Sequence, residues 1–242
     1  MSEIYTMTSR MLNQSKMLDV VSHNMANVNT TGYKRQDLSF KAVLDSSQQK
    51  AEYSNTFSTV ASKNNDFSTG DFKITNNALD LAINGDGFFA VKRGEGTVYT
   101  KNGHFLVNTT GQLVTANGEE VLGTDKQPID IPLGTKVNIT PQGEVKSIDG
   151  ALFGQVGLFK FDNKATLVQA GNSSFASPDE PAMMDINQYS IVRGALESSN
   201  VNPIQESVKL TEVSRAYQSA AKLIKTFEDL ESKAIKDLYK VQ

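Results

Sequence analysis

The sequence contains no cysteine, so it can form neither a disulfide nor a thiolate metal site, and it has no cysteine nucleophile. Positive charge is also scarce, because 24 Lys and Arg stand against 27 Asp and Glu, a formal net charge of −3. A general nucleic-acid-binding surface must neutralise phosphates, so this balance excludes that class of protein. The largest basic cluster is the pair Lys34-Arg35, which we expect at a solvated helix or loop end.

Long apolar runs are absent as well. No stretch approaches the about 20 apolar residues that a membrane-spanning helix needs, so we predict no membrane insertion. The amino-terminal residues MSEIYTMTSRMLNQ lack a charged region followed by an apolar stretch, so we expect no cleaved secretory signal peptide. If the protein leaves the cytoplasm, we expect it to use another route.

Candidate catalytic and metal-binding residues are few. His23 and His104 are far apart in the sequence, and neither has a second ligand at a metal-like spacing. Asp80 and Asp86 could form the carboxylate pair of a sugar hydrolase, but an Asp in an Asp-Gly pair is more often a turn residue. Residues 85–87, Gly-Asp-Gly, precede a strand-like run rather than a helix, unlike a phosphate-binding loop. We therefore predict no enzyme, with no catalytic residue, cofactor, metal or small-molecule substrate.

An apolar stripe runs along each end of the chain. Residues 3 to 28, and the segment that follows Asn202 and Pro203, carry apolar side chains at a spacing of three and four, which is typical of one face of a helix. Asn202 can cap the second helix, and Pro203 suits its first position. Ten residues form the predicted assembly seam: Met7, Met11, Leu18, Val21, Met25, Leu210, Val213, Tyr217, Ile224 and Phe227.

Each apolar stripe lacks a partner within its own segment. We expect the two helices to pair with each other or with neighbouring molecules in a coiled-coil-like assembly. The alternative is that they are ordinary core helices lying on their own domain. The polar stretch after the first helix and the length of the second favour packing between molecules.

The segments between the helices differ in composition. Residues 33–66 are rich in Ser, Gln, Asn and Lys, with too little apolar area to offset the entropy of ordering them, so we expect an extended polar linker. Residues 67–195 are β-rich, with glycine-containing turns arriving roughly every ten residues, as in an antiparallel sandwich or partly open barrel. One such turn, at residues 84–87, predicts a hairpin. The predicted fold class is α+β, with an all-β antiparallel domain flanked by an amino-terminal region (1–32) and a carboxy-terminal assembly helix (196–242).

Three motifs, in this order, resemble those of the bacterial flagellar rod and hook proteins. The first, after the first helix, is HNMANVNTTGYK at residues 23–34. The second is LDLAINGDGFFAV at 79–91, followed by YTKNGHF at 99–105 and GQLVT at 111–115. The third is LESSNVNP at 196–203, which opens the second helix. The ordered set covers nearly the whole chain, and Met25 in place of the family's usual Leu conserves volume.

The resemblance implies a structural subunit of the flagellar basal-body rod, or drive shaft. The length leaves no room for the large outer domain of a hook protein, and EIYT at 3–6 with Asn202-Pro203 is more similar to the proximal than to the distal rod branch. In this family the terminal helices pair and line an inner tube of the periplasm-spanning rod. The implied partners are other rod proteins, copies of the chain itself and the flagellar type III export apparatus. The implied joints between the helices and the outer β domain are Asn24, Asn27, Asn29, Thr31, Gly32, Tyr33, Ser199, Asn200, Val201 and Asn202.

Composition and patterning alone leave one other class open. A free-standing, non-catalytic, extracellular carbohydrate-binding or adhesin-like β domain with helical flanks has the same order of elements. In that case both helices would be protected against proteolysis in the monomer, whereas the rod interpretation predicts labile ends around a protected core.

Overall fold

The computed structural model describes residues 2–44, 56–185 and 189–239, and the chain divides into two compact units. The first unit comprises residues 1–26, 36–66 and 202–242, and the second comprises residues 27–35 and 67–201. The α+β class predicted from the sequence is confirmed. Residues 45–55, in the middle of the expected polar linker, lie outside the described residues.

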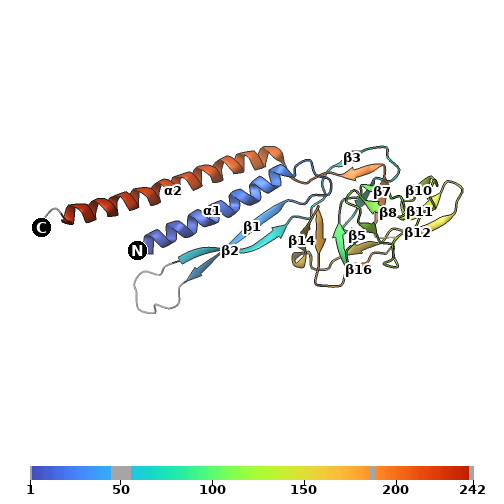
Figure 1. Ribbon diagram of the computed structural model, residues 1–242, viewed down its shortest axis with the longest axis horizontal. Coiled ribbons are helices and arrows are strands. Elements are labelled where there is room, and N and C mark those ends of the chain that lie inside the picture. Colours follow the sequence, from blue (N-terminus) through green and yellow to red (C-terminus); the bar gives the residue numbers. More distant parts are fainter. Residues whose placement is uncertain (1, 45–55, 186–188, 240–242) are drawn as a thin grey trace. The chain divides into compact units, whose positions relative to one another are not determined.

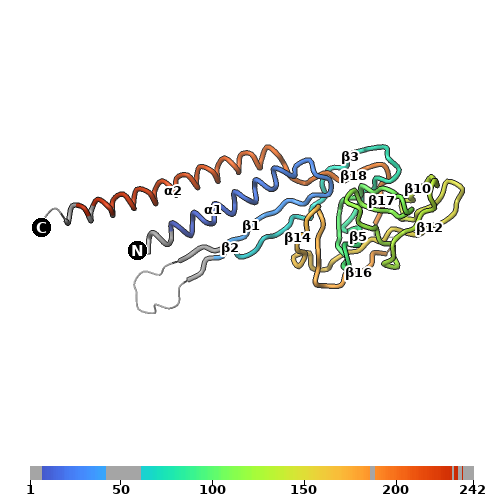
Figure 2. Tube along the Cα trace, viewed as in Figure 1, coloured from blue at the N-terminus to red at the C-terminus, as the bar shows by residue number. Residues whose placement is uncertain are grey.

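The first unit contains two helices and a β hairpin (Figure 1). Helix α1 (Ser2–Ala26) contacts helix α2 (Pro203–Tyr239) and both strands of the hairpin, β1 (Gln36–Leu44) and β2 (Thr56–Asn65). Figure 2 shows the same arrangement along the Cα trace, with segments from both ends of the chain side by side. At 1.5 Å per residue, α2 with 37 residues is about 55 Å long and α1 with 25 residues about 38 Å, so α1 is too short to cover all of α2.

The start of α2 follows from its capping residue. The Asn202 side-chain oxygen accepts hydrogen bonds from the backbone N–H groups of Ile204 (3.0 Å) and Gln205 (3.2 Å). These are donors of the first turn that have no partner inside the helix, so the Asn202 side chain satisfies them. Pro203 occupies the first helical position, where its missing N–H costs nothing.

The second unit is built around a nine-stranded antiparallel sheet. Its main path runs β14-β15-β6-β5-β9-β8-β7, and β13 joins it by pairing with both β5 and β16. The bounds are β5 (Phe88–Arg93), β6 (Gly96–Thr100), β7 (Phe105–Val107), β8 (Leu113–Thr115), β9 (Glu120–Val121), β13 (Leu158–Lys160), β14 (Val168–Gly171), β15 (Ser174–Ala176) and β16 (Ala182–Met183).

Smaller sheets complete the second unit. One contains β10 (Val137–Ile139), β11 (Glu144–Ser147) and β12 (Leu152–Gln155). Two others are the pairs β4 (Leu81–Asn84) with β17 (Ser190–Arg193), and β3 (Phe72–Ile74) with β18 (Ala195–Glu197). A short 3-10 helix, η1 (Lys164–Thr166), precedes β14.

Strand β5 lies at the centre of the core, because both of its faces are covered. Its side chains alternate between two hydrophobic clusters, with Phe89 and Val91 in one and Phe88 and Ala90 in the other. All four are at most 1 % exposed. The continuous apolar run Phe88-Phe89-Ala90-Val91 is therefore typical of a strand buried on both faces rather than of one with a solvent-exposed face.

The turn at residues 84–87 does not form the hairpin that its sequence predicts. Strand β4 before it pairs with β17, whereas β5 after it pairs with β6, β9 and β13. The expectation was wrong because a turn signal determines that the chain reverses locally but not which strands become neighbours. Neighbouring strands do form hairpins elsewhere in the second unit, including β5 with β6, β7 with β8, and β10 with β11.

Candidate assembly site

The α1 half of the predicted seam lies on a partly covered stripe of the helix. Val21 is buried with 1 % of its surface exposed. Leu18 and the three methionines of the seam are half-buried. Leu12, which points away from this stripe, is 55 % exposed. The spacing of three and four thus places the apolar residues on one side of α1, as the 3.6-residue period requires.

The α2 half shows the same pattern. Val213 is buried, and the other four residues of this half are half-buried: Leu210, Tyr217, Ile224 and Phe227. Most of the residues between them are exposed, and α2 contacts α1 within the first unit. Most of the seam is therefore covered only in part by the chain itself.

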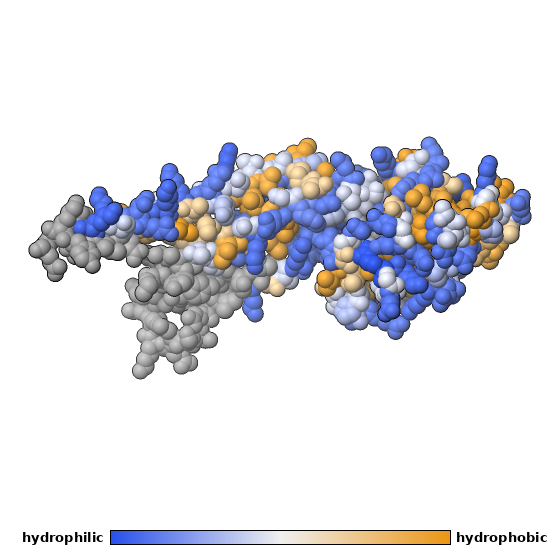
Figure 3. Space-filling view, viewed as in Figure 1, coloured by the Kyte–Doolittle hydropathy of each residue, from blue (hydrophilic) through white to orange (hydrophobic). Residues whose placement is uncertain are grey.

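A second apolar stripe on α2 was not predicted from the sequence. Ile204, Val208, Leu223 and Leu230 are each more than half exposed. On the face drawn in Figure 3, hydrophobic residues are visible along the helices. Leu223 also lines a shallow groove between α1 and α2, together with Met7, Arg10, Gln14, Ala216, Ser219 and Ala220. Successive members lie four, fifteen and seven residues apart, a spacing that keeps them on one broad side of a helix and could have revealed the stripe.

Asn24, the first joint residue, closes the end of α1 onto the start of β1. Its side-chain amide donates to the backbone oxygen of Gln36 (2.9 Å), and its side-chain oxygen accepts from the Gln36 N–H (2.9 Å). Both residues are fully buried. These two hydrogen bonds need a side chain that carries a donor and an acceptor at the right spacing, which explains an amide at this position.

Residues 27–33 form compact turns after α1. The Thr30 N–H donates to the Asn27 backbone oxygen (3.1 Å), and the Thr30 hydroxyl donates to the Asn27 side-chain oxygen (3.1 Å). The Tyr33 N–H then donates to the Thr30 oxygen (3.3 Å). Of the other predicted joint residues here, Asn29 is exposed and Thr31 is half-buried.

Gly32 occupies a position that only glycine can fill without strain. Its φ is +66°, in the left-handed region, and a Cβ added to it would lie 2.4 Å from the backbone nitrogen of Asn102. The Gly32 N–H donates to the backbone oxygen of Glu197 (2.8 Å). Tyr33, the next residue, is 2 % exposed. The first and third sequence motifs therefore meet in the second unit.

In the third motif, Asn200 forms hydrogen bonds to Arg35 and Ser68. The Asn200 side-chain oxygen accepts from the Arg35 N–H (2.7 Å), and its amide donates to the Ser68 backbone oxygen (3.2 Å) and hydroxyl (3.0 Å). The Val201 N–H donates to the Ser199 hydroxyl (3.3 Å), and Val201 is buried. The Asn200 contacts join residues that no local sequence pattern links.

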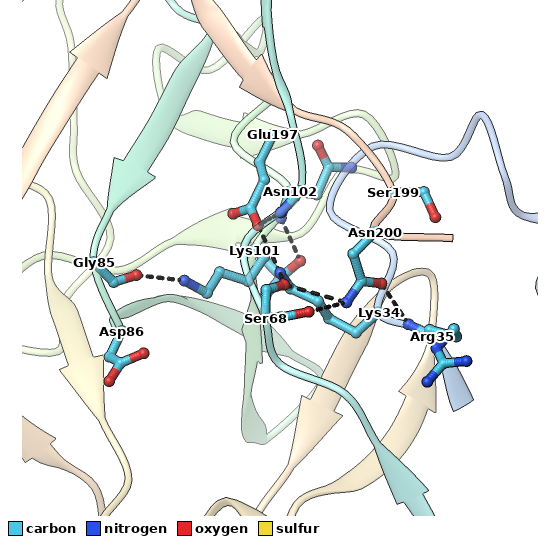
Figure 4. A network of polar contacts seen from close by, with 12 residues as sticks. Lys34, Arg35, Ser68, Gly85, Asp86, Lys101, Asn102, Glu197, Ser199 and Asn200 are labelled. Carbon is cyan, nitrogen blue, oxygen red and sulfur yellow. Dashed lines mark hydrogen bonds and ion pairs between the residues drawn. The ribbon is translucent and has the colours of Figure 1, made fainter. Parts of the chain in front are cut away.

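Lys34 and Glu197 form a buried ion pair at the centre of the site (Figure 4). The Lys34 Nζ lies 2.6 Å from the Glu197 Oε1, and both side chains have no exposed surface. The Lys34 Nζ also donates to the Ser68 backbone oxygen (2.7 Å), and the Gly70 N–H donates to the Glu197 Oε1 (3.0 Å). The expectation that Lys34 is solvated was wrong, because its carboxylate partner is distant in the sequence and invisible to local composition.

Lys101 is a second buried cation beside this pair. Burial lowers the pKa of Lys101 to about 8, the nearby Glu197 carboxylate opposes that shift, and the Lys34 ammonium adds to it. Its Nζ donates to the Gly85 backbone oxygen (2.8 Å) and lies 5.3 Å from the centre of the Phe88 ring. Figure 4 shows the side chain directed to Gly85.

Three of the four candidate catalytic and metal-binding residues, His104, Asp80 and Asp86, pair with other side chains. The Asp80 carboxylate lies 2.7 Å from the His104 Nδ1 and also accepts from the Asn77 amide (3.1 Å). The exposed Asp86 lies 2.8 Å from the Lys164 ammonium, which lowers the pKa of that carboxyl. Across the described ranges, no three acidic or histidine side chains gather closely enough to hold a metal ion. Among the helices described, none is long and apolar enough to cross a membrane.

Family models match the same three regions that carry the sequence motifs. Residues 4–34 match "Flagella basal body rod protein", residues 82–147 match "Flagellar hook protein FlgE/F/G D1 domain", and residues 192–237 match "Flagellar basal body rod FlgEFG protein C-terminal". These matches, together with an α+β fold that has a helix at each end of the chain, define a protein of the flagellar rod and hook class.

Curated relatives narrow this class. The chain is 33 % identical to the flagellar basal-body rod protein FlgF of Caulobacter vibrioides, with 98 % of each chain covered. It is 31 % identical to FlgF of Mesorhizobium japonicum, with 97 % of each covered, and 34 % identical to the rod protein FlgG of Bacillus subtilis, with 94 % of this chain and 95 % of the relative covered. The chain belongs to the flagellar basal-body rod protein family. It is a structural rod subunit of the flagellar basal body, and its relatives are structural proteins rather than enzymes.

Proposed function

We propose that this rod subunit polymerises through its terminal helices, whose seams pair in a coiled-coil-like assembly within and between subunits. The observation that carries the proposal is the incomplete coverage of apolar surface in the first unit. Eight of the ten seam residues are only half-buried, and the second stripe of α2 has four apolar residues more than half exposed. Burying apolar area stabilises by about 25 cal/mol per Å², so neighbouring subunits that cover these residues would be held strongly.

The relatives support the proposed placement in the rod. Two relatives named FlgF match over almost the whole chain, which supports a position in the proximal rod. The proposed partners are copies of the chain and adjoining rod proteins. We further propose that the subunit reaches the periplasm-spanning rod through the flagellar type III export apparatus, without a cleaved signal peptide.

The same proposal assigns a different role to each unit. The helices provide the assembly surface, and residues 67–195 form the outer domain. The joint residues at 24–33 and 199–202 connect the two. Their support is structural: the Asn24 double hydrogen bond, the left-handed Gly32, the Asn200 contacts and the Asn202 cap all lie where the chain passes between units.

The test places a carboxylate in each half of the seam. Leu18→Asp and Ile224→Asp are introduced separately into the bacterium of origin in place of the native gene. An unpaired carboxylate buried in an apolar contact costs several kcal/mol, so each variant should lose rods in isolated basal bodies and swimming motility. Limited proteolysis of the purified variants should still yield a protected β core of roughly residues 67–195, because the seam lies outside the second unit.

Lys16→Asp is the matched control, because it places the same group on an exposed position of the same helix. It should leave rods and motility unchanged. Normal rods in the Leu18→Asp and Ile224→Asp strains would contradict assembly through the seam.

A further inference from the structure

The chain passes between its two units at four points, after Ala26, Arg35, Asp66 and Val201. Each unit is therefore joined to the other by several covalent connections rather than by one linker. The residues on the second-unit side of three of these points are 32–35, 67–70 and 197–201. These three stretches meet in the polar network of Figure 4.

The Lys34–Glu197 pair makes the central contacts of that network. Lys34 is one residue from the crossing after Arg35, and its Nζ reaches both the Glu197 carboxylate and the Ser68 backbone oxygen. Glu197 in turn accepts from the Gly70 N–H through Oε1 and from the Gly32 N–H through its backbone oxygen. One ion pair thus connects all three stretches.

Stability alone is a poor explanation for this pair. Both side chains are fully buried, and removing two charges from water costs about as much as their attraction returns. The second oxygen of the carboxylate, Oε2, accepts no hydrogen bond from the described residues. An apolar pair of similar volume at such a site is often neutral or stabilising. Charged hydrogen bonds are directional, however, and apolar contacts are not.

Lys101 cannot replace Lys34 as the partner that joins the stretches. Its Nζ donates to the Gly85 oxygen, in the connection between β4 and β5, and not to Ser68. It supplies positive charge near Glu197 without linking any of the crossing points. The joining function therefore depends on Lys34.

We propose that Lys34 and Glu197 are positioning residues for rod assembly: their ion pair holds three crossing points in one arrangement, at no gain in stability over an apolar pair. The inference rests on the proposed function. Every subunit of a polymer makes the same contacts, so the three crossing points must have the same geometry in each copy. Without the pair, the second unit still folds, but the connections to α1, β1 and α2 lose their single geometry.

The experiment compares Lys34→Met, Glu197→Met and the double variant in the full-length chain. Each single variant leaves the other charge of the pair buried without its partner, so its Tm should fall by on the order of 10 °C. The double variant should recover a Tm within about 4 °C of the parent, which is the shift that roughly 1 kcal/mol produces in a chain of this size. In hydrogen exchange, the amides of Gly70 and Arg35 should exchange faster in the double variant than in the parent. In cells, it should form no rods.

The exposed pair Lys126–Glu180 provides the matched control. Its charged atoms lie 2.9 Å apart, but the side chains are 51 % and 84 % exposed. Replacing both with Met should change neither Tm, exchange at Gly70 and Arg35, nor rod formation, because exposed pairs contribute little.

Three results would overturn the proposal. Rods formed normally by the double variant would show that assembly does not need the pair. A double variant as unstable as the single variants, or unfolded, would show that the pair serves stability. Unchanged exchange at Gly70 and Arg35 would show that the pair does not hold the connections. If the parent gene itself fails to support rods, the proposed function is wrong, whereas the exchange measurement on the soluble chain still decides the positioning role.

Discussion

The buried ammonium of Lys101 gives the sharpest quantitative prediction. Its side chain is 2 % exposed, and burial lowers its pKa from 10.5 to about 8, against the attraction of Glu197. The other charged groups that act on it are Lys34 and Lys164, which lower the pKa, and Asp86, which raises it. In the unfolded chain the lysine regains its ordinary pKa.

The pH dependence follows from the proton count. Between about pH 8 and pH 10.5, Lys101 is neutral in the folded chain and protonated in the unfolded chain, so the free energy of unfolding rises with pH in that interval. Below pH 8 both states carry the proton, and the folded state bears the full cost of the buried charge. At 1.36 kcal/mol per pKa unit, the total rise from this group is roughly 3 kcal/mol.

The measurement is urea denaturation of the parent and of Lys101→Met at several pH values from 7 to 10.5. Methionine keeps the approximate size of the side chain and cannot titrate. All other titrating groups are shared, so the difference in unfolding free energy between the two proteins isolates Lys101. Relative to the variant, the parent should gain about 3 kcal/mol across the interval, whatever the constant cost of losing the bond to the Gly85 oxygen. A difference that is flat with pH, or that moves against the parent, would refute the reasoning.

Two further predictions concern the joint and the second stripe. Gly32→Ala should destabilise the second unit by more than the roughly 1 kcal/mol of a left-handed alanine, since the new Cβ would overlap the Asn102 backbone; a thermal melt with an unchanged Tm would contradict this. Leu223→Asp combined with Leu230→Asp should preserve the Tm of the monomer, because both side chains are more than half exposed, yet prevent rod formation; rods at the parental level would show that this stripe contacts no neighbour.

The two helices illustrate what periodicity can predict. Helix propensity, capping and apolar spacing are properties of neighbouring residues, so the extent of each helix, the Asn202 cap and the covered stripe could all be expected from the sequence. The exposed stripe of α2 was not predicted because Glu212, Arg215 and Ser219 interrupt it between Val208 and Leu223. Its significance depends on which apolar residues of α2 stay exposed beside α1, and only the tertiary structure shows that.

The joint illustrates the opposite case. Asn24, Gly32 and Asn200 were singled out through a family resemblance, but their partners could not be expected from any local pattern. Lys34 seemed an ordinary solvated lysine, and its carboxylate lies 163 residues further along the chain. Burial of a charge is acceptable only where a distant segment supplies the counter-charge, and composition carries no record of that.

By itself, the sequence determined the α+β class, the helical ends with their apolar stripes, the absence of thiol chemistry and the family. These depend on spacing, residue type and motif order, all of which are local or linear. Tertiary structure alone decided that β4 pairs with β17, that Lys34 and Lys101 are buried around Glu197, and that the three crossing stretches share one network. Each of these depends on which distant segments become neighbours, and that choice minimises the free energy of the whole packed chain rather than of any one segment.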